Sequence, residues 1–491
     1  MSALTALSVD RRERLVSWAK YIPVALLVLW YFSWSARLSV SIHQGYGTSA
    51  FDIGLYDQGL WLLSHFKAPF VTLMGRNLFG DHTSFTLLLL VPLYWIHPDP
   101  STLLVVQALV LALAAVPVYV LALKRMNSVI IATVLAAALL LHPALAQSNM
   151  ENYHPDSFLV LFVALAIYGA LESKQRLFIV ASVLAMLTKE DALLVVVPLG
   201  LWYAWRRNRK VGFTIAGVSV AWTLFATNVI MRALIGVPTL NSWRIPFGGP
   251  KGFVARTFTK PNQVAKYLYH DNRPWYMWQM LAPTGLVFLL QPEVAAIGVL
   301  VLASNVVSNF LYQHLIGYHY VMPILPALAM GTVFAVSKLR TQLLRYTATA
   351  VVGVAAITTA YMWGPYTFSR QHIAHWSPSY SVVHDINAIR DQVPPNAVLS
   401  SYHAYAPHLS HRARIYTWPT PFSAAYWDTF KQEGQRLPFA NQIQYVILPT
   451  QLDVPSQEVW APIRDDFEIV ATNEAATLYK RIRPDPADTP P

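Results

Sequence analysis

Residues 21–34 read YIPVALLVLWYFSW, a continuous apolar and aromatic stretch behind the basic segment RRERLVSWAK (11–20). A helix needs about 20 mostly apolar residues to cross a bilayer, and this stretch with its flanks provides them. No small-residue cleavage site follows, so we expect an anchored first span and not a removed signal peptide. The chain as a whole is also apolar, since 55% of its 491 residues are hydrophobic and only 12% are charged. That balance is typical of a polytopic membrane protein and not of a soluble enzyme.

Clusters of Lys and Arg between the apolar runs predict how the chain crosses the membrane. They lie at the N-terminus and at 124–125, 174–176, 206–210 and 338–345. Short loops rich in these residues face the cytoplasm, so all five clusters are placed on that side. This gives about eleven spans in the plasma (inner) membrane, with a cytoplasmic N-terminus and an extracytoplasmic C-terminus. The expected spans lie near 20–40, 102–123, 128–146, 157–172, 177–189, 192–205, 212–232, 276–290, 294–309, 318–337 and 345–363.

Segment 177–205 is too long for one span and short for two complete ones. A single span here would put the basic cluster 206–210 on the outside, against the charge rule. We therefore expect two short helices, 177–189 and 192–205, that meet at TKED (188–191) below the outer surface. Broken helices of this kind are tolerated where they line a cavity.

Three regions are expected on the extracytoplasmic side. Loop 41–101 contains one apolar helix, FTLLLLVPLYWI (85–96), at or dipping into the membrane interface. Loop 233–275 is the second region. The third is a small α/β domain, 364–491, that follows an all-α transmembrane domain, 1–363. Strand-like pieces in the third region are NAVLSSY (396–402), QYVILPT (444–450) and ATLYKR (476–481).

Other classes of site are excluded by composition. The chain has no cysteine, so it contains no disulfide and no thiolate metal site. Its formal net charge of +11 resides largely in the loop clusters, and no Lys/Arg-rich run is interleaved with aromatic residues. We expect membrane lipids as partners, and no nucleic acid.

Two aspartates in AFDIGLYDQGLW (50–61) raise the question of function. Asp52 and Asp57 are five residues apart, about 140° around a helix axis, and would not share one face. We expect Asp52 to cap the start of a helix, with Asp57 one and a half turns inside it. This alone would be a cap and a solvated acid at the membrane surface.

Further His and acidic residues are expected on the same outer face. They are Asp81 and His82 in GDHTS (80–84), Glu151, His154 and Asp156 in ENYHPD (151–156), Lys189, Glu190 and Asp191 in TKED, and His319 in YHY (318–320). Each has an ordinary explanation, such as a helix cap for Asp156, an ion pair for Lys189 or an interfacial aromatic role for His319. Ionisable groups at membrane depth are costly, however, and four clusters on one face predict a single site.

The motifs AFDIGLYDQGLW, GDHTS, YHPDS, TKEDALL and YHYVMPILPAL resemble an uncharacterised family of polytopic prokaryotic membrane proteins. They span residues 50–330. That family is similar in layout to the GT-C glycosyltransferases, which have acids in a first extracytoplasmic loop and a C-terminal extracytoplasmic domain. The resemblance implies a GT-C-like membrane glycosyltransferase. It would move a sugar from a polyprenyl-phosphate donor to an extracytoplasmic glycan, lipid or protein acceptor.

In GT-C enzymes an acid of the first loop is the catalytic base or a metal ligand. Asp52 matches best, but many members have two adjacent acids where this chain has D-x4-D, which leaves Asp57 as the alternative. An acid of the second loop assists, here Glu151 or Asp156. The residues expected to bind substrate are Asp81, His82, Glu151, His154, Asp156, Lys189, Glu190, Asp191, Arg273 and His319.

Glycosyl transfer would need a carboxylate to take the acceptor proton and cations to receive the leaving phosphate. Lys189 is one candidate cation. The bases of loop 233–275 are another, or they bind anionic lipid headgroups. They are Arg244, Lys251, Arg256, Lys260, Lys266 and Arg273. A divalent ion, Mg²⁺ or Mn²⁺, is a further possibility, with Asp52, Asp81, His82 and Asp156 as candidate ligands, although no spacing is diagnostic.

Two other classes of function use the same residues differently. A transporter or lipid flippase would use the ionisable groups as a path across the membrane. The clustering on one face and the lack of an inverted sequence repeat favour the transferase. A noncatalytic scaffold would bind partners through residues 364–491 alone.

Overall fold

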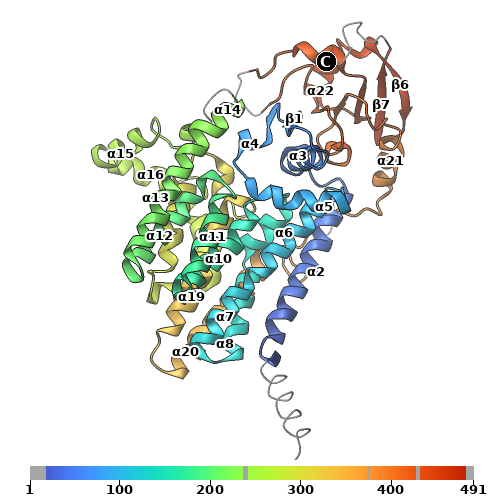
Figure 1. Cartoon of the computed structure of the whole chain (residues 1–491). Coiled ribbons are helices and arrows are strands. Elements are labelled where there is room, and N and C mark those ends of the chain that lie inside the picture. The colour runs from blue at the N-terminus through green and yellow to red at the C-terminus, as the bar shows by residue number, and fades with distance from the viewer. Residues whose placement is uncertain (1–17, 236–240, 374–375, 427–431, 483–491) are drawn as a thin grey trace, which may run out of the picture.

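The computed structural model describes residues 18–235, 241–373, 376–426 and 432–482. Figure 1 shows a bundle of helices with a small β-sheet at one end and the start of α2 at the other. The helices up to the end of the bundle are α2 (Ile22–Gln44), α3 (Leu55–Ser64), α4 (Leu78–Asp81), α5 (Val91–Ile96), α6 (Ser101–Leu113), α7 (Ala115–Met126), α8 (Val129–Leu140), α9 (Pro143–Glu151), α10 (Ser157–Leu171), α11 (Gln175–Met186), α12 (Leu193–Arg206), α13 (Arg209–Phe225), α14 (Met231–Ile235), α15 (Pro250–Thr259), α16 (Pro261–Tyr269), α17 (Arg273–Leu281), α18 (Val299–Val307), α19 (Leu325–Ser337) and α20 (Gln342–Trp363).

Several of these helices are long and apolar enough to cross a membrane. Within the described residues they are Ile22–Gln44, Ser101–Met126, Arg209–Ile235, His319–Ser337 and Gln342–Trp363, with α8 and α9 as a sixth span bent by 41°. Shorter apolar helices are Phe85–Ile96, Ser157–Leu171, Gln175–Met186 and Ala295–Val307. The expected polytopic helical architecture is therefore present, and the count of eleven spans stays a prediction.

The expected spans 276–290 and 294–309 show why fewer long helices form. The backbone is left-handed at Gly285 (φ +59°) and Leu286 (φ +57°), which ends a right-handed helix. Short 3₁₀ turns then lead to the start of α18. Such irregular backbone is tolerated at membrane depth where protein surrounds it.

The ends of the helical hairpins have local causes. Asn127 adopts left-handed φ +49° after α7, and the Ser128 side chain accepts a hydrogen bond from the Ile131 amide at the start of α8. The Asn208 side chain likewise accepts from the Val211 amide (3.1 Å) at the start of α13. Polar caps of this kind satisfy amides that have no partner in the helix.

Two of the basic clusters meet at one end of α10. Arg125 Nε donates to Glu172 Oε1 (2.8 Å), and Lys124 pairs with the same carboxylate. Arg207 donates to the carbonyls of Ala170 (3.0 Å) and Leu171. The prediction that clusters 124–125 and 206–210 share a side is thus confirmed, whereas the side that faces the cytoplasm stays a prediction.

The 177–205 segment forms two helices as expected. α11 and α12 are joined through TKED by a 3₁₀ turn, Glu190–Ala192. The apolar run 85–96 is also helical, as a 3₁₀ turn, Phe85–Leu90, followed by α5.

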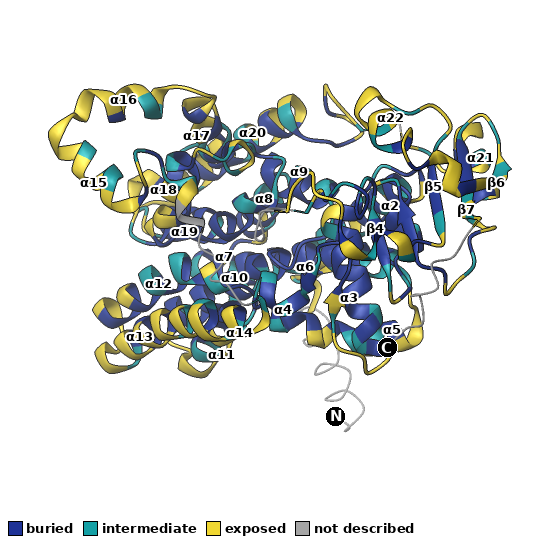
Figure 2. Cartoon of the chain, turned by 90° about the horizontal axis from the view of Figure 1, so that it is seen from above, coloured by how far each residue is buried: buried dark blue, intermediate teal, exposed yellow. Residues whose placement is uncertain are grey.

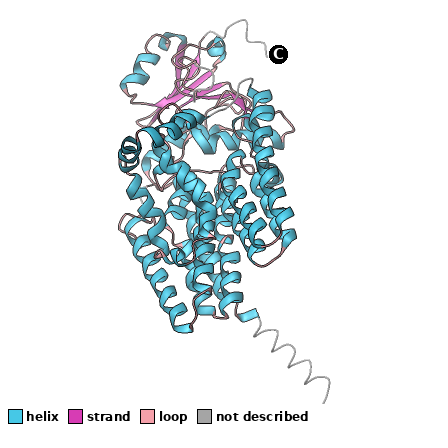
Figure 3. Cartoon of the chain, turned by 90° about the vertical axis from the view of Figure 1, so that its left-hand side faces the viewer, coloured by secondary structure: helices cyan, strands magenta, loops and turns pink. Residues whose placement is uncertain are grey.

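The C-terminal region contains a five-stranded sheet of order β4-β3-β5-β7-β6 at one end of the bundle (Figure 3). Its strands are β3 (Leu399–Ser401), β4 (Ile415–Thr417), β5 (Tyr445–Pro449), β6 (Phe467–Thr472) and β7 (Ala476–Arg481), with helices α21 (Ser381–Arg390) and α22 (Val454–Trp460). β3 is parallel to β4 and β5, whereas β7 is antiparallel to β5 and β6. The three predicted strands are confirmed, and β4 and β6 were not foreseen.

The buried core is continuous between the bundle and this sheet. One cluster of buried residues includes Leu111 in α6 and also Leu399, Ile447 and Leu478 in the sheet. A second cluster around Trp418 and Trp460 lies within the C-terminal region. The division into domains at 363/364 therefore stays a prediction, although α20 ends at Trp363.

The first loop is attached to the C-terminal region by hydrogen bonds from a threonine side chain to the backbone. A small hairpin of β1 (Phe70–Val71) and β2 (Arg76–Asn77) follows α3. Thr72, in its turn, donates to the Ile415 carbonyl (2.6 Å) and accepts from the Ile415 amide (2.9 Å). These bonds join the β1–β2 turn to the edge strand β4.

Candidate functional site

Asp52 lies in a strained turn between α2 and α3. Residues Ala50–Gly54 form a π-helical turn in which Asp52 has φ +69° and ψ −93°, close to the rare γ-turn conformation. Such a backbone costs on the order of 1–3 kcal/mol for a residue other than glycine and persists only where its surroundings hold it. The Ala50 amide donates to the His403 carbonyl (2.7 Å), which fixes the turn from the C-terminal region.

The expectation that Asp52 caps a helix is wrong. α3 begins at Leu55 with Gly54 as its N-cap, and no side chain caps it. The tight turn points the Asp52 carboxylate at a histidine from another part of the chain, where Oδ2 lies 3.2 Å from His154 Nε2. A tertiary contact has replaced the local one.

Asp52 belongs to a compact group with Glu151, His154 and His319. The two imidazoles stack with ring centres 3.4 Å apart and 18° between planes. The His319 amide donates to Glu151 Oε2 (3.0 Å), and His319 Nδ1 lies 3.6 Å from the same oxygen. Glu151 ends α9, His154 lies between α9 and α10, and His319 begins the 3₁₀ turn before α19. We call these four residues the Asp52 cluster.

The electrostatics of the cluster favour a charged His154. Burial lowers the pKa of an imidazole, but here the carboxylates of Asp52, Glu151 and Asp156 outweigh it and raise the pKa of His154. His154 Nε2 faces Asp52 Oδ2, whereas His319 Nδ1 is buried and makes no hydrogen bond within the described residues.

The TKED residues provide ion pairs beside this cluster. Lys189 Nζ donates to both oxygens of Asp156 (3.1 and 3.2 Å) and lies 3.9 Å from Asp191. Glu190 accepts from His82 Nδ1 (2.7 Å). Burial opposes the charged His82, but Glu190 outweighs it and raises the pKa of His82 to about 9. Burial also opposes the charged Glu190, whose pKa His82 and Lys189 nevertheless hold below its usual range.

Asp81 has a partner that the sequence did not suggest. Arg76 in β2 is buried, and its Nη1 donates to Asp81 Oδ1 (2.9 Å). The pair holds the end of α4 against the β1–β2 hairpin. Asp81 Oδ2 lies 4.0 Å from Nε2 of the adjacent His82.

Arg244, one of the bases of loop 233–275, is a further cation at the site. Its guanidinium lies 4.3 Å from the ring centre of Phe310 and 5.7 Å from that of Tyr320. Lys189 Nζ lies 5.7 Å from the same Tyr320 ring, and His319 packs against that ring at 4.0 Å. The buried Nε of Arg244 makes no hydrogen bond within the described residues. Residue spacing carries no signal for this approach, because folding alone brings Arg244 to Tyr320.

Two of the predicted site residues lie in other surroundings. Asp57 is 0% exposed and accepts from Tyr94 (2.7 Å), His411 Nε2 (3.1 Å) and Ser410. Arg273 is buried in α17 and donates to the carbonyls of Val306 (2.8 Å) and Ser308 (2.9 Å). Within the described residues, neither is hydrogen-bonded or ion-paired to the Asp52 cluster.

The sequence pattern of a family described as "Predicted membrane protein (DUF2079)" matches residues 43–468. This range covers most of the chain and every group described above. The chain belongs to the DUF2079 family. A search of curated proteins finds no match.

The fold of this DUF2079 protein is similar to that of two solved ArnT structures. The crystal structure of ArnT from Cupriavidus metallidurans bound to undecaprenyl phosphate has a TM-score of 0.54 at 13% identity, over 92% of this chain and 97% of ArnT. Apo ArnT from the same organism has a TM-score of 0.52 at 14% identity, over 97% and 98%. The predicted resemblance to GT-C enzymes is thus confirmed at the level of the fold.

Three residues of the Asp52 cluster have the side chains and spacing that could hold a metal ion. One ligand atom each from Glu151, His154 and His319 lie within 4.8 Å of one another. His319 Nδ1, buried and without a hydrogen bond within the described residues, fits such a role, and His154 would bind an ion after losing its proton. Of the ligands expected from sequence, Asp52 adjoins this triad, whereas Asp81, His82 and Asp156 bond to Arg76, Glu190 and Lys189.

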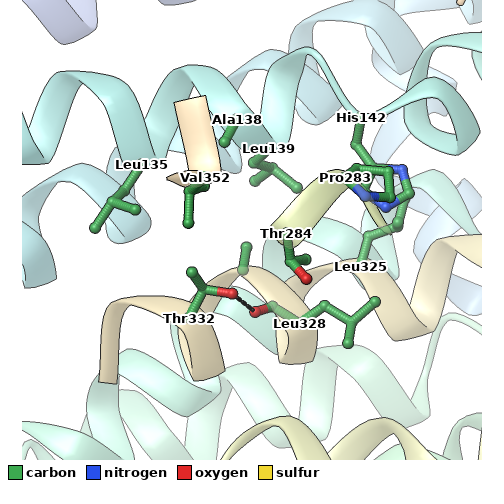
Figure 4. A pocket seen from close by; sticks show the side chains of 11 residues that line it. Leu135, Ala138, Leu139, His142, Pro283, Thr284, Leu325, Leu328, Thr332 and Val352 are labelled. Carbon is green, nitrogen blue, oxygen red and sulfur yellow. Dashed lines mark hydrogen bonds between the residues drawn. The ribbon is translucent and has the colours of Figure 1, made fainter. Parts of the chain in front are cut away.

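A small recess between α8, α19 and α20 is lined mostly by apolar side chains and contains none of these charged residues. Figure 4 shows its lining, where Thr332 donates to the Leu328 carbonyl (2.8 Å) and the other side chains include Leu135, Leu139 and Val352. Its volume of about 20 Å³ suffices for one water molecule and not for a sugar. The His142 ring at its edge is already bonded to the Met280 carbonyl (3.1 Å).

Proposed function

We propose that this DUF2079 protein is an integral membrane glycosyltransferase. It transfers a sugar from a polyprenyl-phosphate donor to a glycan, lipid or protein acceptor on the extracytoplasmic side, where the C-terminal region lies. The observation that carries the proposal is Asp52, strained and partly open, beside buried histidines and cations. The GT-C fold supports it, and one of the ArnT structures holds undecaprenyl phosphate.

Asp52 is the better candidate for the base. A general base must lie within hydrogen-bond reach of the proton that it takes. Asp52 is 13% exposed, and within the described residues its one ionic neighbour is His154. Asp57 is fully buried, and both of its oxygens already accept hydrogen bonds.

The reaction would be a direct displacement. The acceptor oxygen forms a bond to the anomeric carbon while the bond from that carbon to the donor phosphate breaks. The hydroxyl proton passes to the Asp52 carboxylate, and the bonding electrons leave with the phosphate. Attack from the opposite face inverts the anomeric centre. A proton-accepting carboxylate in such a step contributes typically 10²–10⁴-fold in rate.

The leaving phosphate needs positive charge, since no acid has to protonate it. Lys189 and Arg244 each lie 5.7 Å from the ring centre of Tyr320. Arg244 is suited to phosphate because its guanidinium presents several fixed donors, and its Nε is unoccupied in the described residues. Lys189 remains paired with Asp156 and would act as a nearby point charge.

Glu151, His154 and His319 would hold a divalent metal ion. Two imidazoles with one carboxylate favour a transition-metal ion over Mg²⁺, which prefers oxygen ligands. When bound, the ion would supply further positive charge for the phosphate. The protein residues orient one another without it, through the stacked rings and the bond from the His319 amide to Glu151.

The test compares membranes from a deletion strain complemented with wild type, Asp52→Asn or Asp465→Asn. Asp465 is an exposed aspartate in a turn of the C-terminal region and is the matched control. Mass spectrometry would follow polyprenyl-phosphate sugars and envelope glycans, with the folded protein quantified in each strain. We expect a lipid-linked sugar to accumulate, a glycan to lose a residue, and only Asp52→Asn to fail in restoring both. If neither pool changes, or Asp52→Asn restores both, the transferase proposal fails and a transporter is favoured.

A further inference from the structure

Helices α15 and α16 form a hairpin outside the helical bundle. Figure 1 shows it projecting sideways near the end of the bundle that carries the C-terminal region, and Figure 2 shows most of it as exposed. Among residues 250–269 only Val264 is buried. A helix of a folded protein normally buries an apolar stripe against its neighbours, and α15 buries none. We call residues 250–269 the basic hairpin.

One side of α16 attaches the basic hairpin to the bundle. Val264 is buried, and Tyr267, three residues on, donates to the Val307 carbonyl (3.0 Å). Tyr267 also accepts from Arg273 (2.6 Å) at the start of α17. The opposite side of α16 carries Lys266 and Tyr269, both exposed. The hairpin is therefore held along one edge and presents its remaining surface outward.

The basic hairpin carries positive charge without local compensation. Lys251, Lys260 and Lys266 are exposed, and no carboxylate of the described residues pairs with them. The sequence contains no Asp or Glu from 233 to 270. Arg256 donates to Gln263 (2.6 Å), so it links the two helices of the hairpin without losing its charge.

Large apolar side chains lie on the same outward surface. Phe258 and Tyr269 are each 82% exposed, and Val254 is 55% exposed. On α15, Lys251, Val254 and Phe258 share one face, because they follow a spacing of three and four residues. A lysine whose stem lies along apolar surface while its ammonium reaches polar groups is the arrangement found at membrane interfaces. The neighbouring α17 also exposes two aromatic side chains, Trp275 and Trp278.

We propose that the basic hairpin rests on anionic phospholipid headgroups of the leaflet nearest the C-terminal region. Phe258 and Tyr269 enter the interface, and the three lysines contact lipid phosphates. A lipid surface fits better than a protein partner because the charges are lysines spread along two helices and the apolar groups are exposed side chains on those helices. Each juxtamembrane base adds to the attraction toward an anionic surface. The inference concerns lipid contact alone and does not rest on the transferase proposal.

The absence of cysteine from the chain makes the test direct, since a single introduced cysteine is unique. Phe258→Cys would be labelled with an environment-sensitive fluorophore in the full chain, reconstituted in nanodiscs of phosphatidylcholine with or without phosphatidylglycerol. Some lipids would carry a spin label near the headgroup as quencher. The matched control is Val454→Cys in α22, which is 66% exposed in the C-terminal region.

We expect the label at 258 to shift to shorter wavelength and to be quenched, both increasingly with the phosphatidylglycerol fraction. The triple variant Lys251→Gln, Lys260→Gln, Lys266→Gln should return both signals to their values in neutral nanodiscs, and the label at 454 should not respond. Circular dichroism and gel filtration would verify that the variant is folded. An unquenched label at 258 in every nanodisc overturns the proposal. Equal quenching in neutral and anionic nanodiscs, unchanged in the triple variant, overturns the role of anionic headgroups.

Discussion

Asp52 and Asp57 are five residues apart, and the structure gives their carboxylates opposite surroundings. Asp52 lies in a strained turn, is partly exposed, and has His154 as its ionic neighbour. Asp57 lies in regular helix, is fully buried, and is bonded to Tyr94, Ser410 and His411. The Asp52 carboxylate can therefore accept further hydrogen bonds, whereas both oxygens of Asp57 already accept them.

The two carboxylates therefore have different physical tasks. Every bond of Asp57 joins α3 to α5 or to the C-terminal region, so this acid holds parts of the chain together. Asp52 is held in place by those same parts, because its turn depends on the bond from Ala50 to His403. We call the contact between the first loop and the C-terminal region the junction. Asp57 stabilises the junction through its hydrogen bonds, and Asp52 is positioned by it.

The largest expected effect is on turnover, and it should follow from changing Asp52. Asp52→Asn should lower turnover about 10²–10⁴-fold, since the amide cannot take the acceptor proton. Stability should change little, because asparagine tolerates positive φ and keeps the side-chain shape. Turnover with the lipid-linked donor found in the complementation experiment, together with thermal unfolding, would measure both. Turnover within a few-fold of wild type would exclude Asp52 as the base.

A second test asks whether only the Asp52 side holds metal. His319→Ala should remove the metal from purified protein, because it takes one of three ligands from the Glu151, His154 and His319 group. His411→Ala, beside Asp57, is the matched histidine control and should keep it. Elemental analysis after exhaustive dialysis would give the stoichiometry. Equal metal content in wild type and His319→Ala contradicts this assignment.

A third test concerns stability at the junction. Asp57→Ala should destabilise the protein by about 3–5 kcal/mol, as expected when one member of a buried, bonded ion pair is removed. The C-terminal region should become sensitive to proteolysis, which Asp52→Asn should not cause. Thermal unfolding and limited proteolysis in detergent would show the difference. An unfolding temperature equal to that of wild type would mean that Asp57 does not hold the junction.

The smallest expected effect is a pH dependence at the same junction. Burial lowers the pKa of His411, but Asp57 outweighs it, and the net shift is upward. A raised pKa in the folded state means that this contribution to stability is complete below the ordinary pKa of about 6.5 and is lost as pH rises through the folded value. Thermal unfolding from pH 6 to 9 should therefore show a decline that His411→Gln reduces. Parallel curves for the two proteins would contradict the coupling.

The sequence predicted much of what is periodic or local. Apolar runs predicted a polytopic helical protein, and the two helices meeting at TKED and the strands at 399–401, 445–449 and 476–481 were found. The short strand β4 was not foreseen, because three residues carry too little alternation to be recognised. Asp52 was expected as a helix cap because aspartate favours that position, and a long-range contact with His154 prevailed instead.

By itself, the sequence determined the membrane class, the helical architecture and the clusters of acid and histidine that deserved attention. These follow from composition and spacing, which act over a few neighbouring residues. Only the tertiary structure decided which acid is open, that Glu151, His154 and His319 converge, and that Arg244 approaches Tyr320. Each of these depends on contacts between segments that are distant in the chain, and such contacts arise from the packing of whole helices and strands.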